Sequence, residues 1–392
     1  MNYDFTTLPD RSGSTAEKFV NMRRIDPSVP SNIVPFSVAD MDFLPPPQLI
    51  KGLQNFIGRT IFGYTLTPNS YYEAVLDWMR RRHGLKIPRE WLVDADNVIA
   101  ALRQMIEAYT APGDGIIVMT PAYPAFLSSV EATRRSLLAC PLKLENNRYS
   151  IDYNVLEELC RREDAKILVL CNPHNPVGRV WNREELEQVA RICLVHQVFV
   201  ISDEIHWDLI LPGHTFTSMA ALDPDYVHNC AVSTACTKTF NMAAMKGAVV
   251  ILADEQRRAD FLARNGVSGR DLLSYAMPEI AYQTCEDWLD ELLVVLDGNR
   301  KLMEQFMAER LPEVGVIPLE GTYLQWLDFR FLGMDPPEQA DFMARKARCF
   351  FTEGYKFGPG GAGFERWDLA CPQSVLLAGL ERMEQAVKGL KR

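Results

Sequence analysis

The chain lacks the features of membrane and secreted proteins. No apolar run approaches the roughly 18 residues that a transmembrane helix needs, and the first residues lack the basic and then apolar stretch of a secretory signal. The nine cysteines are scattered, odd in number and without a Cys-x-x-Cys pair, which excludes a disulfide framework and a zinc knuckle. We therefore expect a cytoplasmic protein with most of its cysteines in the core.

Lysine and arginine are outnumbered by aspartate and glutamate, 41 residues against 51. The 392 residues carry a formal net charge of −10, which argues against a nucleic-acid-binding surface. The one dense basic run, 80–83, ends a helix-like segment, where it complements the helix dipole. We expect neither a nucleic-acid nor a membrane partner.

Strand and helix patterns alternate from about residue 90 to 285. Short, uniformly apolar runs, which read as strands buried on both faces, lie at 115–119, 166–171 and 198–201. Asn182, with Glu185 three positions on, marks the start of a helix between two of them. The pattern predicts an α/β fold whose large domain has a mostly parallel central sheet flanked by helices.

The pattern changes after residue 285 and predicts a smaller α+β domain. The segment 322–327 alternates like a strand with one exposed face. Helices are predicted at about 290–310, 338–348 and 372–391. The predicted division is an N-terminal segment that packs on the small domain (1–48), a large domain (49–285) and a small domain (286–392).

Three polar residues follow successive apolar strands in the order Asn175, Asp203 and Lys238. In open α/β sheets, ligands bind beyond the carboxyl ends of the strands. A lysine there can form a Schiff base, and a buried carboxylate can keep a pyridine nitrogen protonated. This order indicates a site for pyridoxal 5′-phosphate (PLP), with Lys238 as the catalytic residue.

Neighbouring residues complete the predicted cofactor site. Asn175 and His206 are candidates to bind the phenolic oxygen of PLP, and Tyr123 is a candidate to stack on its ring. Each alone has an ordinary alternative, because Asn175 precedes a proline in a turn, the histidine can be structural and the tyrosine can simply pack.

The phosphate of PLP needs backbone N–H groups at the start of a helix. Small and apolar residues begin a helical pattern after Val98, and we assign the phosphate contacts to Ala101 and Leu102. Lys246, eight residues after Lys238, adds a positive charge.

Two acidic groupings suggest metal ligation less well. Asp40 and Asp42 have no third ligand nearby. Glu204, His206 and Asp208 lie on one strand face, but PLP accounts for their neighbours too. We predict no metal site.

Nearly the whole chain resembles the fold-type-I PLP enzymes of the aspartate aminotransferase superfamily. Within them it is most similar to the bacterial cystathionine β-lyase-like C–S lyases of the MalY/PatB type. The motifs that carry the resemblance are VADMDF at 38–43, FGY at 62–64, NPHNPVG at 172–178, DEIH at 203–206, KTFN at 238–241, WLD at 288–290, YLQWLD at 323–328 and FER at 364–366.

The resemblance implies a role for each matched residue. Lys238 binds the cofactor and moves the substrate α-proton, and Asp203 pairs with the pyridine nitrogen. Arg366 binds the substrate α-carboxylate, for which a guanidinium is suited, beside Ala39 and Tyr123. Tyr64 reaches the cofactor phosphate of a neighbouring subunit, which implies a homodimer.

Three departures from the family pattern leave the side-chain preference open. Thr237 stands where serine usually precedes the lysine and also counts among the cofactor contacts. The run 17–21 reads EKFVN near the position of a usual KWD, and 242–245 reads MAAM where a sequence like LAGL is usual.

The resemblance implies β-elimination from an amino acid with a sulfur leaving group on Cβ, such as cystathionine or a cysteine conjugate. The products are a thiol, pyruvate and ammonia. An aminotransferase using the same residues is the alternative. A regulatory protein that retains the fold is less favoured, because Lys238, Asp203 and Arg366 are intact.

Overall fold

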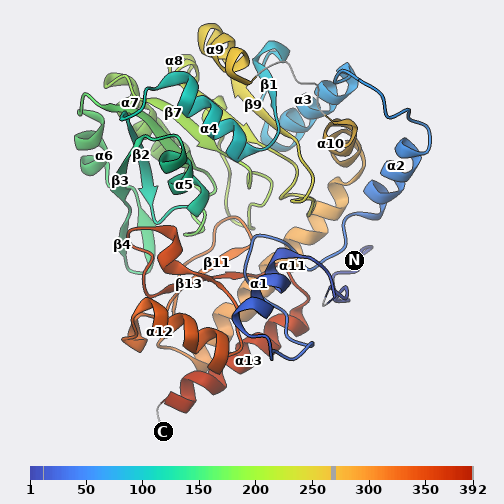
Figure 1. The fold of residues 1–392 in the computed structure, drawn as a ribbon, viewed down its shortest axis with the longest axis vertical. Helices are drawn as coiled ribbons and strands as arrows, with labels where there is room; N and C mark the ends of the chain where they lie inside the picture. The colour runs from blue at the N-terminus through green and yellow to red at the C-terminus, as the bar shows by residue number, and fades with distance from the viewer. Residues whose placement is uncertain (12, 266–270, 391–392) are drawn as a thin grey trace.

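A seven-stranded sheet forms the centre of the larger part of the molecule (Figure 1). The computed structural model describes residues 1–11, 13–265 and 271–390. The strands, in their order across the sheet, are β1 (Leu92–Ala95), β9 (Ala248–Leu252), β8 (Cys230–Thr234), β7 (Phe199–Asp203), β6 (Ala165–Cys171), β2 (Gly115–Thr120) and β3 (Ser136–Pro141). Only β9 runs antiparallel to its neighbours, so the predicted mostly parallel sheet is confirmed.

Both faces of this sheet are covered. Along β2, Ile116 and Val118 belong to one apolar cluster, while Ile117 and Met119 belong to the other. Successive strand residues point to opposite faces, which explains why these strands read as uniformly apolar runs. The helices of this part are α2 (Pro47–Ile57), α3 (Asn69–His83), α4 (Val98–Tyr109), α5 (Pro124–Ala132), α6 (Tyr153–Cys160), α7 (Arg183–Val195), α8 (Pro224–His228), α9 (Glu255–Asn265) and α10 (Leu272–Thr284).

The smaller part contains a second sheet. Its antiparallel strands are, in order, β10 (Gly315–Val316), β11 (Leu324–Asp328), β13 (Phe364–Asp368) and β12 (Thr352–Glu353). A separate hairpin, which belongs to the larger part, pairs β4 (Lys143–Glu145) with β5 (Arg148–Ser150). The helices of the smaller part are α11 (Glu286–Arg310), α12 (Pro336–Asp341) and α13 (Gln373–Leu390). The predicted helix at 338–348 is only partly right, because α12 gives way to a π-helical turn at Phe342–Lys346.

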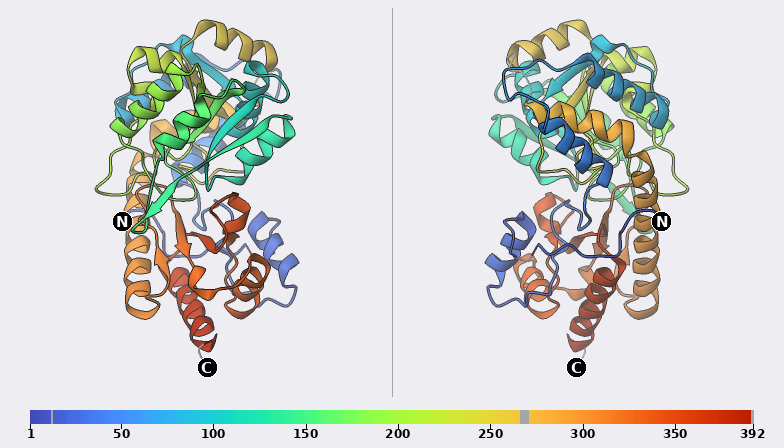
Figure 2. Two further views of the ribbon diagram at one scale, coloured as in Figure 1. Left: turned by 90° about the vertical axis from the view of Figure 1, so that its left-hand side faces the viewer. Right: turned by 90° about the vertical axis from the view of Figure 1, so that its right-hand side faces the viewer.

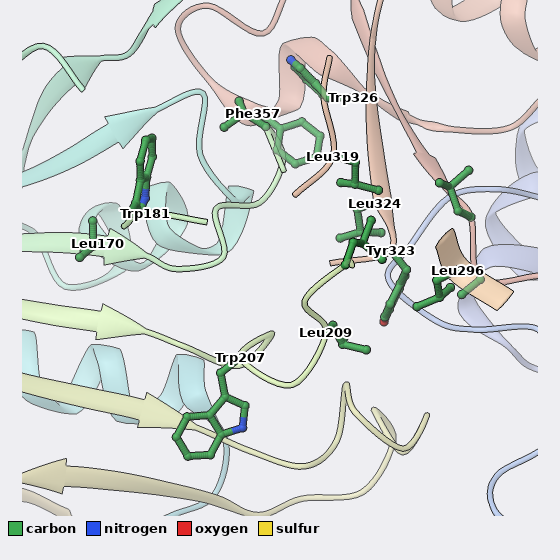
Figure 3. Packing of buried hydrophobic residues seen from close by; sticks show 14 of the residues in the cluster. Leu170, Trp181, Trp207, Leu209, Leu296, Leu319, Tyr323, Leu324, Trp326 and Phe357 are labelled. Carbon is green, nitrogen blue, oxygen red and sulfur yellow. The ribbon is translucent and has the colours of Figure 1, made fainter. Parts of the chain in front are cut away.

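The expectation that 322–327 exposes one face is wrong. Gln325 and Trp326 are both buried, and the Trp326 indole Nε1–H donates to the Tyr149 hydroxyl of the larger part at 3.3 Å. The Thr322 N–H donates to the Leu209 carbonyl at 2.7 Å. Figure 3 shows Leu209 close to Tyr323 and Leu324 among these side chains. The strand is buried on both faces because it lies where the two parts meet.

The N-terminal segment lies against the smaller part (Figure 2). Phe36 bonds through its backbone to Phe350 and Asp368, at 2.8 and 3.0 Å. Phe19 and Met22 of α1 (Glu17–Ile25) share an apolar cluster with Phe350. The division of the chain at residues 48 and 285 stays a prediction. Among the described helices, none combines the length and apolarity needed to cross a membrane.

We predict that removing the cap of α7 destabilises the protein. The Asn182 side chain accepts from the Glu185 N–H at 2.8 Å, and the Glu185 carboxylate accepts from the Asn182 N–H at 2.9 Å. Asn182→Ala should lower the free energy of unfolding by about 1 kcal/mol, measured by urea denaturation. Asn182→Ser, which keeps a capping oxygen, is the matched control and should lose much less. Equal losses in the two variants would contradict a capping role.

Candidate active site

A cavity of about 360 Å³ lies beyond the carboxyl ends of β6, β7 and β8, between the two parts. The predicted site residues that line it are Ala39, Tyr123, Asn175, Asp203, His206, Thr237, Lys238 and Arg366. Four others do not line it, namely Tyr64, Ala101, Leu102 and Lys246. Most of the predicted site residues therefore lie around one cavity, although four of them do not.

Lys238 is a half-buried amine whose surroundings favour loss of its proton. Its Nζ donates to the Ala39 carbonyl at 2.8 Å. Burial lowers the pKa of Lys238, and the nearby Arg366 guanidinium lowers it further. A neutral amine is the nucleophilic and basic form, so this environment suits attack on an aldehyde and transfer of a proton.

Asp203 is a buried carboxylate at the end of β7. One of its oxygens accepts the Ile205 N–H at 3.0 Å. Burial raises the pKa of Asp203 to about 7, although this hydrogen bond and the Lys238 charge act against the rise. A cationic ring nitrogen placed beside this carboxylate would stabilise its ionised form. The donor set therefore fits a protonated pyridine.

Arg366 of β13 extends into the cavity from the smaller part. Its Nη1 donates to Asn175 Oδ1 at 2.9 Å and its Nη2 to Thr352 Oγ1 at 3.2 Å, while its buried Nε has no partner among the described residues. Burial lowers the pKa of Arg366 to about 10. A buried guanidinium with spare donors is a ready site for a carboxylate.

His206 and Tyr123 lie on the same lining. His206 is buried, and its Nδ1 has no partner among the described residues. Burial moves the pKa of His206 well below its usual value, so the ring is neutral. Asn175 points its amide oxygen to Arg366, which leaves its NH₂ group as a donor for another acceptor.

The start of α4 lies on the cavity lining, whereas Ala101 and Leu102 do not, and the phosphate contacts stay a prediction. Asn97 caps this helix by accepting the Ala100 N–H at 2.8 Å, and Asn97, Val98 and Ile99 line the cavity. Ala101 and Leu102 lie in the core between α4 and the sheet. The Ala101 N–H is already used, since it donates to the Asn97 carbonyl at 3.0 Å. Free N–H groups belong to the first turn of a helix, and Asn97, a strong N-cap residue, was the sequence signal for its start.

Lys246 and Tyr64 lie away from the cavity lining. The Lys246 side chain is 65% exposed, with its Nζ 3.9 Å from Asp96. Tyr64 is fully exposed, in a segment whose Ile61, Phe62 and Leu66 are also exposed. Within one chain, neither residue completes the site.

A charge network holds the loop that carries Ala39. Lys18 is fully buried, and its Nζ donates to Asp42 Oδ2 and to the Asp40 carbonyl, both at 2.7 Å. Arg11 forms ion pairs with Asp40 and Asp42 at 2.5 and 3.1 Å. Asp42 thus serves to anchor the N-terminal segment, and this loop in turn receives the Lys238 amine.

A second network fixes the residue after Lys238. The buried Asp208 accepts from Trp78 Nε1 at 3.0 Å and from Thr239 Oγ1 at 2.7 Å, and it also contacts His83 Nε2 at 2.8 Å. Glu204 takes part in a separate network, accepting from the Ser202 hydroxyl at 2.9 Å. Asp208 therefore ties the Lys238 loop to α3.

Sequence reasoning gave no site role to Thr352, and it named Glu17 and Met245 only within departures from the family pattern. Val38, quoted within a family motif, also lines the cavity, and its φ of 63° is a conformation that β-branched residues rarely adopt. No local pattern marks Thr352, because it reaches the cavity through the packing of distant segments.

A basic lysine, a buried carboxylate and a buried guanidinium around one cavity of an α/β fold define the class of enzymes that bind an aldehyde through lysine. The sequence model of the family described as Aminotransferase class I and II matches residues 31–354. The chain belongs to this family.

Relatives of the chain support the same assignment. Cystathionine beta-lyase PatB of Bacillus subtilis (strain 168) is 37% identical over 360 residues, covering 91% of this chain and 93% of that protein. Protein MalY of Escherichia coli (strain K12) is 30% identical over 397 residues, covering 99% and 100%. The crystal structure of cystalysin from Treponema denticola, which contains PLP, has a TM-score of 0.97 and 40% identity, covering 100% of both chains. The predicted MalY/PatB-type resemblance is confirmed.

We predict that Lys18→Met destabilises the protein in a pH-dependent way. Burial raises the pKa of Asp42, Lys18 opposes that rise, and burial raises the pKa of the nearby Asp368 to about 7. Without Lys18, both folded-state pKa values rise further above the unfolded value of about 3.9. The stability of the variant is then lost as pH rises toward those pKa values, so its deficit of about 3 kcal/mol at neutral pH shrinks near pH 5.

Urea denaturation of wild type and variant at several pH values measures this deficit. Lys51→Met, which removes an exposed lysine of α2, is the control and should change little. A Lys18→Met deficit that does not depend on pH would contradict the assignment.

Proposed function

We propose that the chain binds PLP and eliminates a sulfur leaving group from Cβ of an amino acid, releasing a thiol, pyruvate and ammonia. The convergence of Lys238, Asp203 and Arg366 on one cavity carries this proposal. The named activity of a relative that is 37% identical, PatB, supports elimination rather than another reaction of the family. The substrate class we infer is cystathionine or a cysteine conjugate.

Different cavity residues are proposed to contact different groups of the cofactor. In our proposal, Lys238 binds its aldehyde, Asp203 faces its ring nitrogen, and Asn175 and His206 donate to its phenolic oxygen. The first turn of α4 at Val98 receives the phosphate, whose charge suits a helix N-terminus. Tyr123 lies over the ring, beside Thr237. Lys246, which does not line the cavity, would act only through the long-range field of its charge. When bound, PLP supplies an electron sink for charge that develops at Cα.

The chain's own groups position the substrate and move its proton. Arg366 holds the α-carboxylate through its free donors, next to Ala39 and Tyr123. The Lys238 amine, whose pKa is lowered by burial, takes the proton from Cα. Ala39 holds the same amine at 2.8 Å and so limits where the proton can go. The electron pair left at Cα would form a double bond to Cβ while the sulfur departs with the pair of its own bond and takes up the proton to leave as a thiol. Water would then convert the remaining fragment into pyruvate and ammonia.

An aminotransferase remains the second candidate, because the matching family carries that description. The same residues serve both reactions. The two differ in what happens after Cα loses its proton, since elimination expels the sulfur group whereas transamination passes the amino group to a keto acid. We infer elimination from the relatives, and a keto acid in the assay separates the two.

We further propose a homodimer in which Tyr64 binds the cofactor phosphate of the partner. An exposed tyrosine amid exposed Ile61, Phe62 and Leu66 is a costly surface unless it is covered. A second copy of the chain would cover this segment and complete the phosphate site. A cytoplasmic location accords with nine free, buried cysteines.

We predict that the purified protein releases pyruvate from cystathionine without an added keto acid. Lys238→Ala should abolish this release, because the amine that binds the aldehyde and takes the proton is lost. Borohydride reduction should leave a pyridoxyl label on Lys238, detected by peptide mapping. Lys51→Ala is the control and should keep both activity and label. A strict requirement for a keto acid would favour the aminotransferase instead.

We predict complementation between two defective chains. Mixing Lys238→Ala with Tyr64→Ala and reassociating the subunits at limiting PLP should restore about a quarter of wild-type activity, because half of the dimers contain one intact site. Lys238→Ala mixed with Asp203→Ala is the control and should restore none, since both of those residues come from one chain. No recovery in the first mixture would contradict a shared site.

A further inference from the structure

Glu17 is an acidic residue on the cavity lining to which the proposed reaction gives no role. It is the first residue of α1, its side chain is exposed, and it lines the cavity together with Val38, Tyr123 and Thr352. Its carboxylate has no ion-pair partner among the described residues. Exposure on a cavity lining places Glu17 at the mouth.

The neighbouring residue fixes where Glu17 points. Lys18 is fully buried and bonded to Asp42 and to the Asp40 carbonyl, so its side chain is directed inward. Successive residues of an α-helix project about 100° apart. Phe19, next along the helix, packs in the apolar cluster of the smaller part. Because Lys18 and Phe19 fix the orientation of α1, the Cα–Cβ bond of Glu17 keeps its direction relative to the cavity lining.

The residues that bind the α-carboxylate and act at Cα determine which part of the cavity lining is left to contact the leaving group. In the proposed function Arg366, which is buried, takes the α-carboxylate and Lys238 acts at Cα. The lining residues without an assigned role include the apolar Val38, Ala243 and Met245, together with the exposed acid Glu17. A thioether chain suits the apolar residues, and a positive charge suits the acid.

We propose that Glu17 is a specificity-determining residue, which favours substrates whose sulfur leaving group carries a positively charged amino group. This inference rests on the proposed function. A carboxylate at a cavity mouth attracts such a group and repels an anionic one, so it discriminates by charge in both directions. The chemistry points to aminoalkyl thioethers of cysteine. The leaving group of cystathionine also carries an amino group, but its carboxylate makes it zwitterionic, so Glu17 favours it less.

Three cysteine derivatives of similar length test the proposal. S-(2-aminoethyl)-L-cysteine, S-propyl-L-cysteine and S-carboxymethyl-L-cysteine carry a cationic, a neutral and an anionic leaving group. Pyruvate release gives kcat and KM for each with the wild-type holoenzyme, Glu17→Gln and Glu17→Lys. Glu381→Gln is the matched control, because it removes the same charge from an exposed position on α13.

In Glu17→Gln, the preference in kcat/KM for the aminoethyl over the propyl substrate should fall about fivefold, mainly through KM. Glu17→Lys should lower it further and raise kcat/KM for the carboxymethyl substrate. Added salt should weaken the wild-type preference, since the mouth is open to solvent. Glu381→Gln should behave as wild type. Preferences within twofold of wild type in both Glu17 variants would overturn the proposal.

A second readout separates this inference from the proposed function. Each amino acid, on binding, should change the absorbance of the bound cofactor, and titration gives its Kd without turnover. If the wild type released no pyruvate from any of them, the lyase proposal would fail. The ratio of Kd values for the aminoethyl and propyl compounds, in wild type and Glu17→Gln, would still decide the role of Glu17, because a ratio unchanged by the substitution would overturn it.

Discussion

The site depends on keeping three ionisable groups in a place where water does not stabilise their charges. Asp203 and Arg366 are buried and Lys238 is half-buried. Burial is the largest influence on each pKa, lowering those of the two bases and raising that of the acid. Keeping these charged groups away from water raises the free energy of the empty cavity. A cofactor cation and a substrate carboxylate would lower that free energy by pairing with them. Binding is thus favoured at the point where chemistry is needed.

The relative position of these groups depends on how the two parts meet. Asp203 ends β7 and Lys238 lies in the loop after β8, both in the larger part, whereas Arg366 belongs to β13. A buried ion pair between Arg179 and Glu320, at 2.9 Å, crosses the junction. Gly178 adjoins it with a φ of 74°, and a Cβ there would lie 2.7 Å from Leu319. Glycine is therefore required for the close approach that aligns the guanidinium with the amine.

How much the sequence predicts follows from how local each signal is. The strands and the residues at their ends, such as Asp203, were predictable because apolar runs and motifs lie in consecutive residues. Thr352 was not, because it reaches the cavity only through pairing of β12 with β13 at Arg366. Ala101 and Leu102, the predicted phosphate contacts, lie about one turn beyond the residues of α4 that line the cavity, since apolar spacing marks a helix better than its first residue. The exposed face expected for β11 failed because the junction between the parts leaves no trace in that strand.

Two adjacent residues of α1 have separate roles, since Lys18 contributes to stability and Glu17 is proposed to contribute to substrate specificity. Lys18 faces inward, where losing its charge would leave Asp42 and its neighbours without compensation. Glu17 faces the cavity mouth, where its charge supports no other described residue through an ion pair. Because α1 is anchored by Lys18 and Phe19, the residue at position 17 can vary at little cost in stability. The position of residue 17 relative to Arg366 stays fixed. A substitution there can therefore change the charge that the leaving group meets with little effect on the stability of the fold.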